Sequence, residues 1–383
     1  MSTPQPPARI VVFVPVDFVG GHERMLLALL ARSVELGLLQ PAIHCGHNPR
    51  LLEWCRAAGL TDVTATTFDL CSNGKLARLA NAIRLYRMAR HCAPNQPVLI
   101  APGSIQSATW YTLAAVLASP HAIMYVPMVF GAGTMGFRFP ALRDWITRWV
   151  SRRVGGWITI SAEQKALLQR LWPITAPVRV VHNVNALASA RDSSIRLQKN
   201  APYLRLLFVG RFDVRQKGLD WLLSFFLRHP RHLQQCRLTL LGAAGEVSKV
   251  DEWAKRLNCL EPEFATILDW QDPEQAYAGA DALILASRFE GLPLVALEAI
   301  GCGLAVLASK QSGLGTIVPN EAMYQFGSDD ELSRVLDRFA DPTVRAETLT
   351  VESEAVQHYL NDDRRDMAIE SVASLVHSMH PDR

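Results

Sequence analysis

The sequence lacks three features: a Cys-x-x-Cys pair, a long uninterrupted apolar run and a strong excess of one charge. Its seven cysteines are an odd number, which favours reduced thiols in a cytosolic protein over a disulfide framework or a zinc site. The most apolar stretch, residues 109–133, is interrupted by Pro120, His121 and Pro127, so a helix followed by a strand fits it better than a membrane span. The polar residues 1–8 lack the apolar core of a signal peptide.

The charge of the chain is nearly balanced but unevenly distributed. The formal net charge of +3 argues against a nucleic-acid partner. Residues 1–190 carry 18 Lys or Arg against 8 Asp or Glu, whereas residues 191–383 carry 21 against 28. We therefore expect two differently charged lobes, the first of which is suited to face an anionic partner.

Short apolar runs rich in β-branched residues alternate with helical patterns along the chain. Strands are predicted at 10–15, 98–101, 122–126, 157–161, 178–182, 204–209, 237–242, 265–268, 282–286 and 305–309, with helices at 22–38, 106–117, 142–154, 162–171, 218–227, 247–257, 273–278 and 293–300. This alternation predicts an α/β fold of two doubly wound, Rossmann-like parallel-sheet domains that face a cleft. The expected divisions are a domain over 1–185, a linker over 186–200, a domain over 201–350 and a helical tail over 351–383 that could cross back to the first domain.

Two glycines, Gly20 and Gly21, follow the first predicted strand. They allow a close approach of the backbone to a phosphate or sugar, and the helix that begins there presents free N–H groups. A tight turn without function explains the same pair of residues. The spacing is not the fingerprint of a nicotinamide-binding loop.

A second motif, residues 209–218, follows the first strand of the second half. Arg211 and Lys217 stand six positions apart in this loop, where two cations can neutralise a diphosphate. Arg215 is an alternative to Arg211, and solvated loop charges are the plain alternative to both.

The third motif, residues 287–303, carries the most information. Glu290 lies in the turn after a predicted strand, and Pro293 suits the first position of the helix that follows. The start of that helix offers N–H groups to an anion, and Glu290 and Glu298 can bind sugar hydroxyls. Alternatively, Glu298 caps or pairs within its own domain, because a carboxylate on an apolar helix face needs a partner.

Together the three motifs resemble the retaining glycosyltransferases of family 4, which have the GT-B fold. Residues 20–24 resemble the GG-x-E-R loop of that family, residues 210–218 its G-R…K-G clamp, and residues 290–298 its E-x7-E motif. Residues 181–184 resemble its P-N-G junction, although His182 stands where the family has proline. The strand end at 124–127 lacks the histidine that many relatives have there.

The resemblance implies roles for particular residues. Arg211 and Lys217 would hold the donor diphosphate and Glu290 would contact the transferred sugar, which makes these three the catalytic set. Glu298 would bond the ribose, and Trp270 would lie against the base. The complete donor-binding set implied is Gly20, Gly21, Arg211, Lys217, Trp270, Glu290, Gly291, Leu292, Leu294 and Glu298. The first domain would bind the acceptor.

A basic amphipathic segment, residues 137–157, interleaves five arginines with Trp145, Ile146, Trp149 and Val150. It fits either a helix that docks on anionic membrane lipids or a packed helix with a solvated basic face. The basic run over 75–90 supports docking only mildly.

The sequence has no DxD beside a suitable strand and no His/Cys cluster, so we expect no metal ion. The resemblance implies a retaining hexosyltransferase that uses a UDP- or GDP-sugar and a glycan or lipid-linked acceptor. Bacterial surface polysaccharide or glycolipid synthesis would be its setting. It would be cytoplasmic and could associate with the inner face of the cytoplasmic membrane. The alternatives are a nucleotide-sugar epimerase or hydrolase on the same fold, and a catalytically idle member of a polysaccharide assembly complex.

Overall fold

The computed structural model describes residues 6–15, 20–46, 48–66, 75–92, 96–106, 108–183, 202–242, 245–269, 273–359 and 362–380. The predicted linker over 186–200 and the candidate residue Trp270 lie outside these ranges. The chain divides into two compact units. Unit 1 comprises Met1–Val184 and Asn361–Arg383, and unit 2 comprises Asn185–Leu360.

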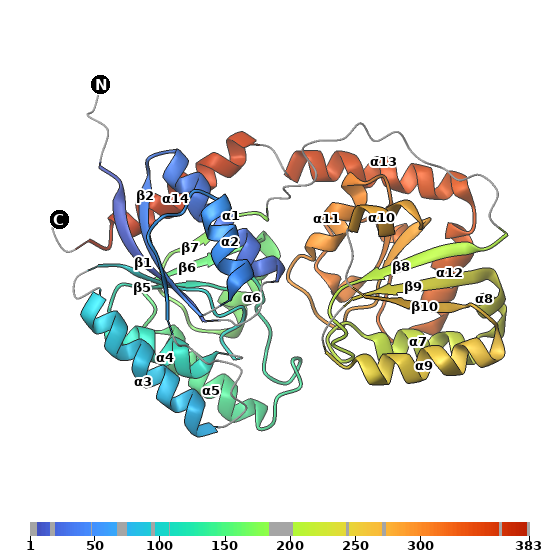
Figure 1. Ribbon diagram of the computed structural model, residues 1–383, viewed down its shortest axis with the longest axis horizontal. Helices are drawn as coiled ribbons and strands as arrows, with labels where there is room; N and C mark the ends of the chain where they lie inside the picture. The colour runs from blue at the N-terminus through green and yellow to red at the C-terminus, as the bar shows by residue number, and fades with distance from the viewer. Residues whose placement is uncertain are drawn as a thin grey trace. The chain divides into compact units, whose positions relative to one another are not determined.

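Unit 1 is built on a parallel sheet of seven strands in the order β3-β2-β1-β4-β5-β6-β7 (Figure 1). Its elements are β1 (Ala8–Val14), α1 (Gly21–Glu35), β2 (Leu39–Cys45), α2 (Pro49–Ala57), β3 (Val63–Ala65), α3 (Lys75–Cys92), β4 (Val98–Ile100), α4 (Thr109–Ala118), β5 (Ala122–Tyr125), α5 (Pro140–Ser151), β6 (Gly156–Thr159), α6 (Ala162–Leu171), β7 (Val178–Val180) and α14 (Asp362–His377). The strand order reverses between β1 and β4, so the loops after these two strands diverge at the sheet's carboxyl edge.

Unit 2 is built on a parallel sheet of six strands in the order β10-β9-β8-β11-β12-β13. Its elements are β8 (Leu204–Val209), α7 (Leu219–Arg228), α8 (Pro230–Gln235), β9 (Cys236–Leu241), α9 (Val247–Leu260), β10 (Ala265–Leu268), α10 (Pro273–Ala278), β11 (Ala282–Leu285), α11 (Leu294–Gly301), β12 (Ala305–Ser309), η1 (Lys310–Ser312), η2 (Asn320–Ala322), β13 (Met323–Tyr324), α12 (Asp329–Phe339) and α13 (Pro342–Tyr359). Here the order reverses between β8 and β11.

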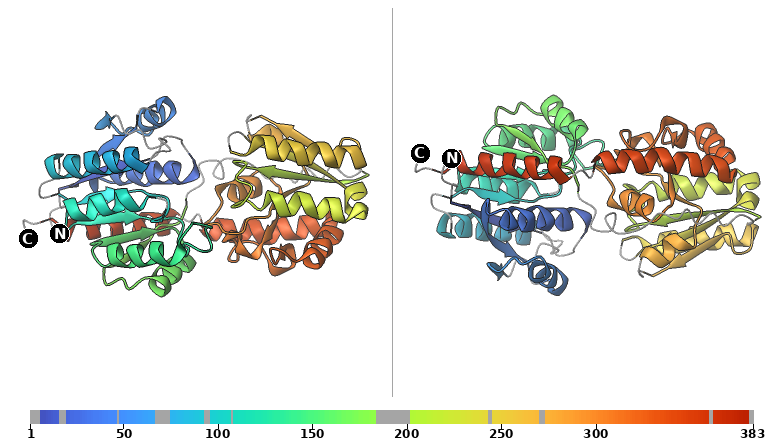
Figure 2. Two further views of the ribbon diagram at one scale, coloured as in Figure 1. Left: turned by 90° about the horizontal axis from the view of Figure 1, so that it is seen from below. Right: turned by 90° about the horizontal axis from the view of Figure 1, so that it is seen from above.

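Each unit buries its sheet between two layers of helices, as two further views show (Figure 2). The central strands read as continuous apolar runs because both faces are covered, and all four residues of β5 and of β11 are buried. The expected α/β class with two parallel-sheet domains is confirmed. No helix among the described residues is both long and apolar enough to cross a bilayer.

Several elements differ from the sequence-based prediction. The prediction placed nothing between 39 and 92, where the structure has β2, α2, β3 and α3. Pro293 precedes α11 as its N-cap and is not its first residue. The basic segment 137–157 is not one helix, because α5 ends at Ser151 and Trp157 is fully buried in β6.

The C-terminal helix α14 belongs to unit 1. Arg32 of α1 holds Asp366 of α14 through two hydrogen bonds of 3.0 and 2.6 Å. Arg179 Nε of β7 donates to the carbonyl oxygen of Ser371 at 3.2 Å. The helix therefore covers part of the sheet that the first half of the chain forms.

Candidate functional site

Two loops meet at the carboxyl edge of the unit 2 sheet. One follows β8 and contains residues 210–218, and the other follows β11 and contains residues 286–293. Since β8 and β11 flank the point at which strand order reverses, this is where ligands of such sheets bind. The two loops are joined directly, because Arg288 N–H donates to the carbonyl oxygen of Gln216 at 2.9 Å.

Lys217 and Glu290 face each other across these loops. Lys217 Nζ forms an ion pair with Glu290 Oε1, and the two side chains are 14% and 9% exposed. Ser287 Oγ donates to the same carboxylate oxygen at 3.3 Å. The structure thus brings together a nearly buried cation and a nearly buried carboxylate from two separate motifs.

Arg211 lies at the outer side of the first loop. Its side chain is 42% exposed and its Nη2 lies 3.7 Å from Asp213 Oδ2. The same Nη2 donates to Gln216 Oε1 at 3.5 Å, a long and weak bond. The alternative cation, Arg215, is also exposed, so both arginines can reach a solvent-side phosphate.

Arg288 was given no role from the sequence, yet its side chain ties the two loops together. Its guanidinium donates to both carboxylate oxygens of Asp220 at 2.8 and 2.7 Å and to the carbonyl oxygen of Arg215 at 2.7 Å. The same group lies 4.5 Å above the ring of Phe326. A bidentate pair of this kind fixes orientation as well as charge, so Arg288 sets the shape of the 210–218 loop.

Two glycines permit this close approach of backbone segments. Gly218 has φ +66°, and a Cβ placed there would lie 1.9 Å from the carbonyl oxygen of Ala286. Gly313 has φ +73°, and its Cβ would lie 2.1 Å from the carbonyl oxygen of Gly291. Both positions require glycine for conformation and for space, and Gly313 had no identifiable signal in the sequence.

The start of α11 lies beside this pair of loops. The helix begins at Leu294, and its N-cap Pro293 has no side chain that could accept from the first N–H groups. Ala296 N–H donates to the carbonyl oxygen of Pro293 at 3.1 Å. The N–H groups of Leu294 and Val295 come too early in the helix for an intrahelical acceptor, which makes a helix start suited to an anion. Gly291 and Leu292 are buried just ahead of it, and Leu294 is half-buried.

Glu298 lies one turn further along α11. It is 4% exposed and accepts a hydrogen bond of 3.3 Å from the hydroxyl of the buried Tyr277 of α10. The structure therefore shows Glu298 paired within its own unit, and its predicted contact with a ribose stays a prediction. Trp270, assigned to the base, is among the residues the structure does not describe.

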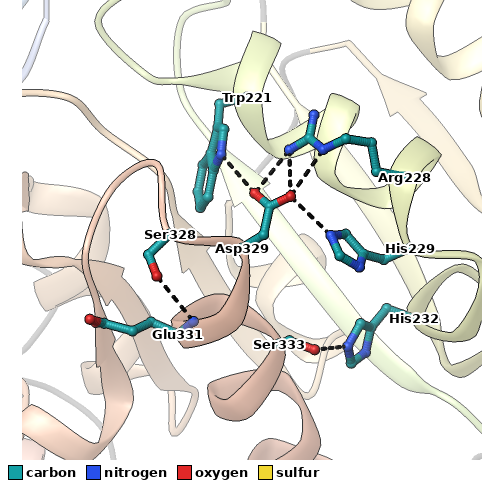
Figure 3. A network of polar contacts seen from close by, with 8 residues as sticks. All are labelled: Trp221, Arg228, His229, His232, Ser328, Asp329, Glu331 and Ser333. Carbon is teal, nitrogen blue, oxygen red and sulfur yellow. Dashed lines mark hydrogen bonds and ion pairs between the residues drawn. The ribbon is translucent and has the colours of Figure 1, made fainter.

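Polar contacts of Asp329 hold α7 against the start of α12 (Figure 3). Helix α7 begins directly after Gly218. The carboxylate of Asp329 accepts from Trp221 Nε1 at 3.1 Å, from Arg228 Nε and Nη2 at 3.0 and 2.9 Å, and contacts His229 Nε2 at 2.9 Å. Burial alone raises the pKa of Asp329, but His229 and Arg228 outweigh burial and hold the pKa below its ordinary value. The loop that carries Lys217 thus leads into a firmly held helix.

The glycine loop of unit 1 forms a small polar arrangement of its own. Gly20 N–H donates to Glu23 Oε2 at 2.8 Å, and His22 Nδ1 lies 2.8 Å from Glu23 Oε1. Burial alone raises the pKa of Glu23, which is 2% exposed, but His22 and the Gly20 hydrogen bond hold the pKa below its ordinary value. The part of this loop over 16–19 is not described.

The imidazole of His22 stacks on Tyr125, the last residue of β5, with ring centroids 6.0 Å apart. Its Nε2 lies 3.3 Å from the carbonyl oxygen of Ala101, directly after β4. The end of β5 itself carries no histidine. The structure places one beside that strand end from α1, which the sequence could not reveal because His22 and Tyr125 are 103 positions apart in the chain.

Residues 203–340, most of unit 2, match the family model described as Glycosyl transferases group 1. The fold of the chain is similar to that of sucrose-phosphate synthase from Thermosynechococcus elongatus, with a TM-score of 0.74, 17% identity, and coverage of 97% of this chain and 99% of that chain. It is also similar to Anabaena HepE in complex with UDP and glucose, with a TM-score of 0.71, 16% identity, and coverage of 97% and 100%.

Curated relatives match over part of their length. The glycogen synthase of Mycobacterium tuberculosis is 29% identical over 178 residues, which are 46% of this chain and 42% of that protein. The sulfoquinovosyl transferase SQD2 of Arabidopsis thaliana is 29% identical over 133 residues, which are 34% of this chain and 24% of that protein. The matched part of the chain thus spans less than half of either relative.

Proposed function

We propose that the protein transfers a hexosyl group from a nucleotide-sugar with retention at the anomeric carbon. The match of residues 203–340 to the model of the group 1 glycosyltransferases and the similarity in fold to sucrose-phosphate synthase support this proposal. The observation that carries this proposal is the pairing of Lys217 with Glu290 beside the start of α11. The cation and the helix start can bind a diphosphate, and the carboxylate can accept a hydrogen bond from a sugar hydroxyl.

The donor in this proposal is a UDP- or GDP-sugar, bound without a metal ion. Its diphosphate lies against Arg211, Lys217 and the backbone of 291–294 in unit 2. The occurrence of UDP and glucose in the structure of Anabaena HepE supports a donor of this class. Glu298 would bind the ribose after exchanging its bond to Tyr277 for one to the nucleotide.

Donor binding requires the ion pair to open. Lys217 leaves Glu290 for the diphosphate, which carries more negative charge than a single carboxylate, and Glu290 then accepts a hydrogen bond from a sugar hydroxyl. As the bond from the anomeric carbon to the phosphate oxygen breaks, negative charge grows on the diphosphate. Lys217, Arg211 and the N–H groups at the start of α11 stabilise that charge in the transition state.

The acceptor in this proposal is a glycan or a lipid-linked glycan, bound by unit 1. Synthesis of a bacterial surface polysaccharide or glycolipid, on the cytoplasmic side of the membrane, would provide such an acceptor. The excess of basic residues in the first 190 positions supports an anionic partner for this half of the chain.

Turnover of a panel of UDP-, GDP- and ADP-sugars tests the proposal. Wild type should consume one donor in the presence of acceptor, and proton NMR of the product should show the anomeric configuration of the donor. Arg211→Ala and Glu290→Ala should each lower turnover by about 100-fold or more. Arg256→Ala, which changes an exposed arginine on α9, should leave turnover unchanged.

Two results would contradict the proposal. Rapid turnover of a nucleotide-sugar without any acceptor would indicate an epimerase or hydrolase. Absence of donor binding to wild type at millimolar concentration would indicate an idle member of an assembly complex.

A further inference from the structure

Exposed apolar side chains gather on three neighbouring helices of unit 1. Helices α3, α4 and α5 lie side by side on one face of the sheet, and α4 contacts both others (Figure 1). Eight of the thirteen large hydrophobic residues that are exposed in the described part of the chain lie here. They are Leu79, Ile83 and Tyr86 on α3, Trp110 and Leu117 on α4, and Phe139, Leu142 and Trp145 at α5.

These side chains point away from the core by the geometry of their helices. On α3 the exposed residues follow the spacing i, i+4, i+7, whereas Leu85 and Ala89 on the other side of the helix are fully buried. On α5, Trp145 is 64% exposed while Val150 is fully buried. The exposed stripes therefore form a second apolar surface that packing against the sheet does not use.

The same three helices belong to a strongly basic part of the sequence. Residues 75–153 contain ten Lys or Arg residues and one acidic residue, Asp144. The carboxylate of Asp144 accepts a hydrogen bond of 2.9 Å from the backbone N–H of Ala132. One of its oxygens is therefore bonded to a neutral donor. This segment accounts for most of the basic excess of the first 190 residues.

Cations and apolar rings lie next to one another at α5. The guanidinium of Arg153 lies 3.5 Å above the ring of Trp149, and that of Arg138 lies 5.5 Å from the ring of the neighbouring Phe139. Phe139 is 68% exposed. Its φ of 56° is unfavourable for a non-glycine residue. Aromatic and aliphatic groups bordered by arginine match the boundary between acyl chains and anionic headgroups.

We propose that α3, α4 and α5, with Phe139, form a face that docks unit 1 on an anionic lipid surface. Charge complementarity selects this occupant, because the segment that forms the face has ten Lys or Arg residues against one acidic residue, and Arg84, Arg87, Arg90 and Arg148 are exposed on α3 and α5 beside the aliphatic side chains. Leu79, Ile83 and Leu142 favour a lipid over a nucleic acid, since aliphatic groups cannot stack on bases in the way that aromatic rings do. The proposal does not depend on glycosyl transfer, and it would place unit 1 at the surface where lipid-linked acceptors reside.

Sedimentation with vesicles tests the face directly. The full chain should sediment with vesicles of phosphatidylcholine mixed with phosphatidylglycerol, should not sediment with phosphatidylcholine alone, and should be released progressively by added salt. The variant Leu142→Gln/Trp145→Gln should bind about tenfold more weakly. The matched variant Val247→Gln/Leu260→Gln changes two exposed residues of α9 in unit 2 and should bind as wild type does.

A second pair of variants separates charge from apolar contact. Arg148→Glu should weaken vesicle binding by about tenfold at low salt, whereas Arg256→Glu on α9 should have no effect. Both positions are exposed, so unfolding temperature and nucleotide binding should match wild type in each variant. Equal binding to neutral vesicles, equal loss in the α9 controls, or tighter binding to RNA than to anionic vesicles would overturn the proposal.

Discussion

Lys217 Nζ and Glu290 Oε1 form an ion pair between two residues that are 73 positions apart in the chain. Each belongs to a loop that follows one of the two strands flanking the reversal of strand order in unit 2. The cation proposed to hold a diphosphate is thus neutralised by the carboxylate proposed to hold the sugar. The donor must therefore compete with an internal anion for Lys217.

Arg288 should act as a positioning residue for the loop that carries Lys217. Asp220→Asn removes the charge from its partner, and Arg288→Lys removes the bidentate geometry while it keeps the positive charge. Each change should lower the free energy of unfolding by about 1–2 kcal/mol, because the pair is partly exposed. Each should also raise the KM for the donor more than it lowers kcat, as steady-state kinetics would show.

A purely structural role for Arg288 predicts a different result. The loss of stability would then leave the donor KM unchanged at temperatures well below unfolding. Arg231→Lys is a suitable control because the ion pair of Arg231 with Asp337 joins α8 to α12, outside the two loops of the candidate site, and the Arg231 side chain is 68% exposed.

Gly218→Ala should be strongly destabilising. Its Cβ would lie 1.9 Å from the carbonyl oxygen of Ala286 in addition to the strain of φ +66°, so we expect a loss of about 3 kcal/mol or more. Gly303→Ala provides the matched control, because Gly303 has φ +80° but nothing within 4 Å of its Cβ. That control should cost only about 1–2 kcal/mol. Equal unfolding temperatures of the two variants would contradict the close approach of Gly218 to the carbonyl oxygen of Ala286.

The buried carboxyl group of Glu352 on α13 should make stability depend on pH. Burial raises its pKa well above the ordinary value, although the N–H of Val306 on β12 donates to both of its oxygens, at 3.2 and 3.0 Å. Because the folded pKa is raised, the folded state holds a proton that the unfolded chain releases above about pH 4.3. Stability is therefore lost as the pH rises from there through the folded pKa.

Glu352→Gln should remove that dependence, since the amide resembles the protonated carboxyl and cannot ionise. Denaturant unfolding between pH 4 and pH 8 measures the free energy of unfolding of both proteins. With rising pH, that of the variant should increase relative to that of wild type, by about 1.4 kcal/mol for each pH unit between the unfolded and folded pKa of Glu352. A difference between variant and wild type that stays constant with pH would contradict the assignment.

Donor turnover should not require a divalent cation. Lys217, Arg211 and the start of α11 already place positive charge at the proposed diphosphate position. Turnover in excess EDTA should equal turnover in buffer alone. Loss of activity in EDTA that added Mg²⁺ restores would contradict metal independence.

Most of the fold could be predicted from the sequence where apolar runs are punctuated by glycine and proline. The bounds of β8, β10, α10 and β12 agree with the prediction to the residue. The segment from 39 to 92 was not predicted because β2 contains Pro41 and His44, and because polar and apolar residues alternate without a clear period through α3. The local sequence pattern carries little information about such elements. For a strand such as β2, pairing with neighbouring strands decides the structure.

The candidate site was predictable in its motifs but not in its contacts. The loops around Lys217 and Glu290 could be found because each follows a recognisable strand. The bond between Arg288 and Asp220 joins residues 68 positions apart, and nothing in either local sequence specifies the partner. The local sequence likewise does not specify that the ring of His22 lies on that of Tyr125.

Isothermal titration with UDP and with GDP, in wild type, Lys217→Met and Glu290→Gln, tests the central claim most directly. If the diphosphate replaces Glu290 as the partner of Lys217, Glu290→Gln should bind one nucleotide several-fold more tightly than wild type, because the competing anion is gone. Lys217→Met should bind that nucleotide at least about tenfold more weakly. Nucleotide affinities that are the same in all three proteins would contradict the account.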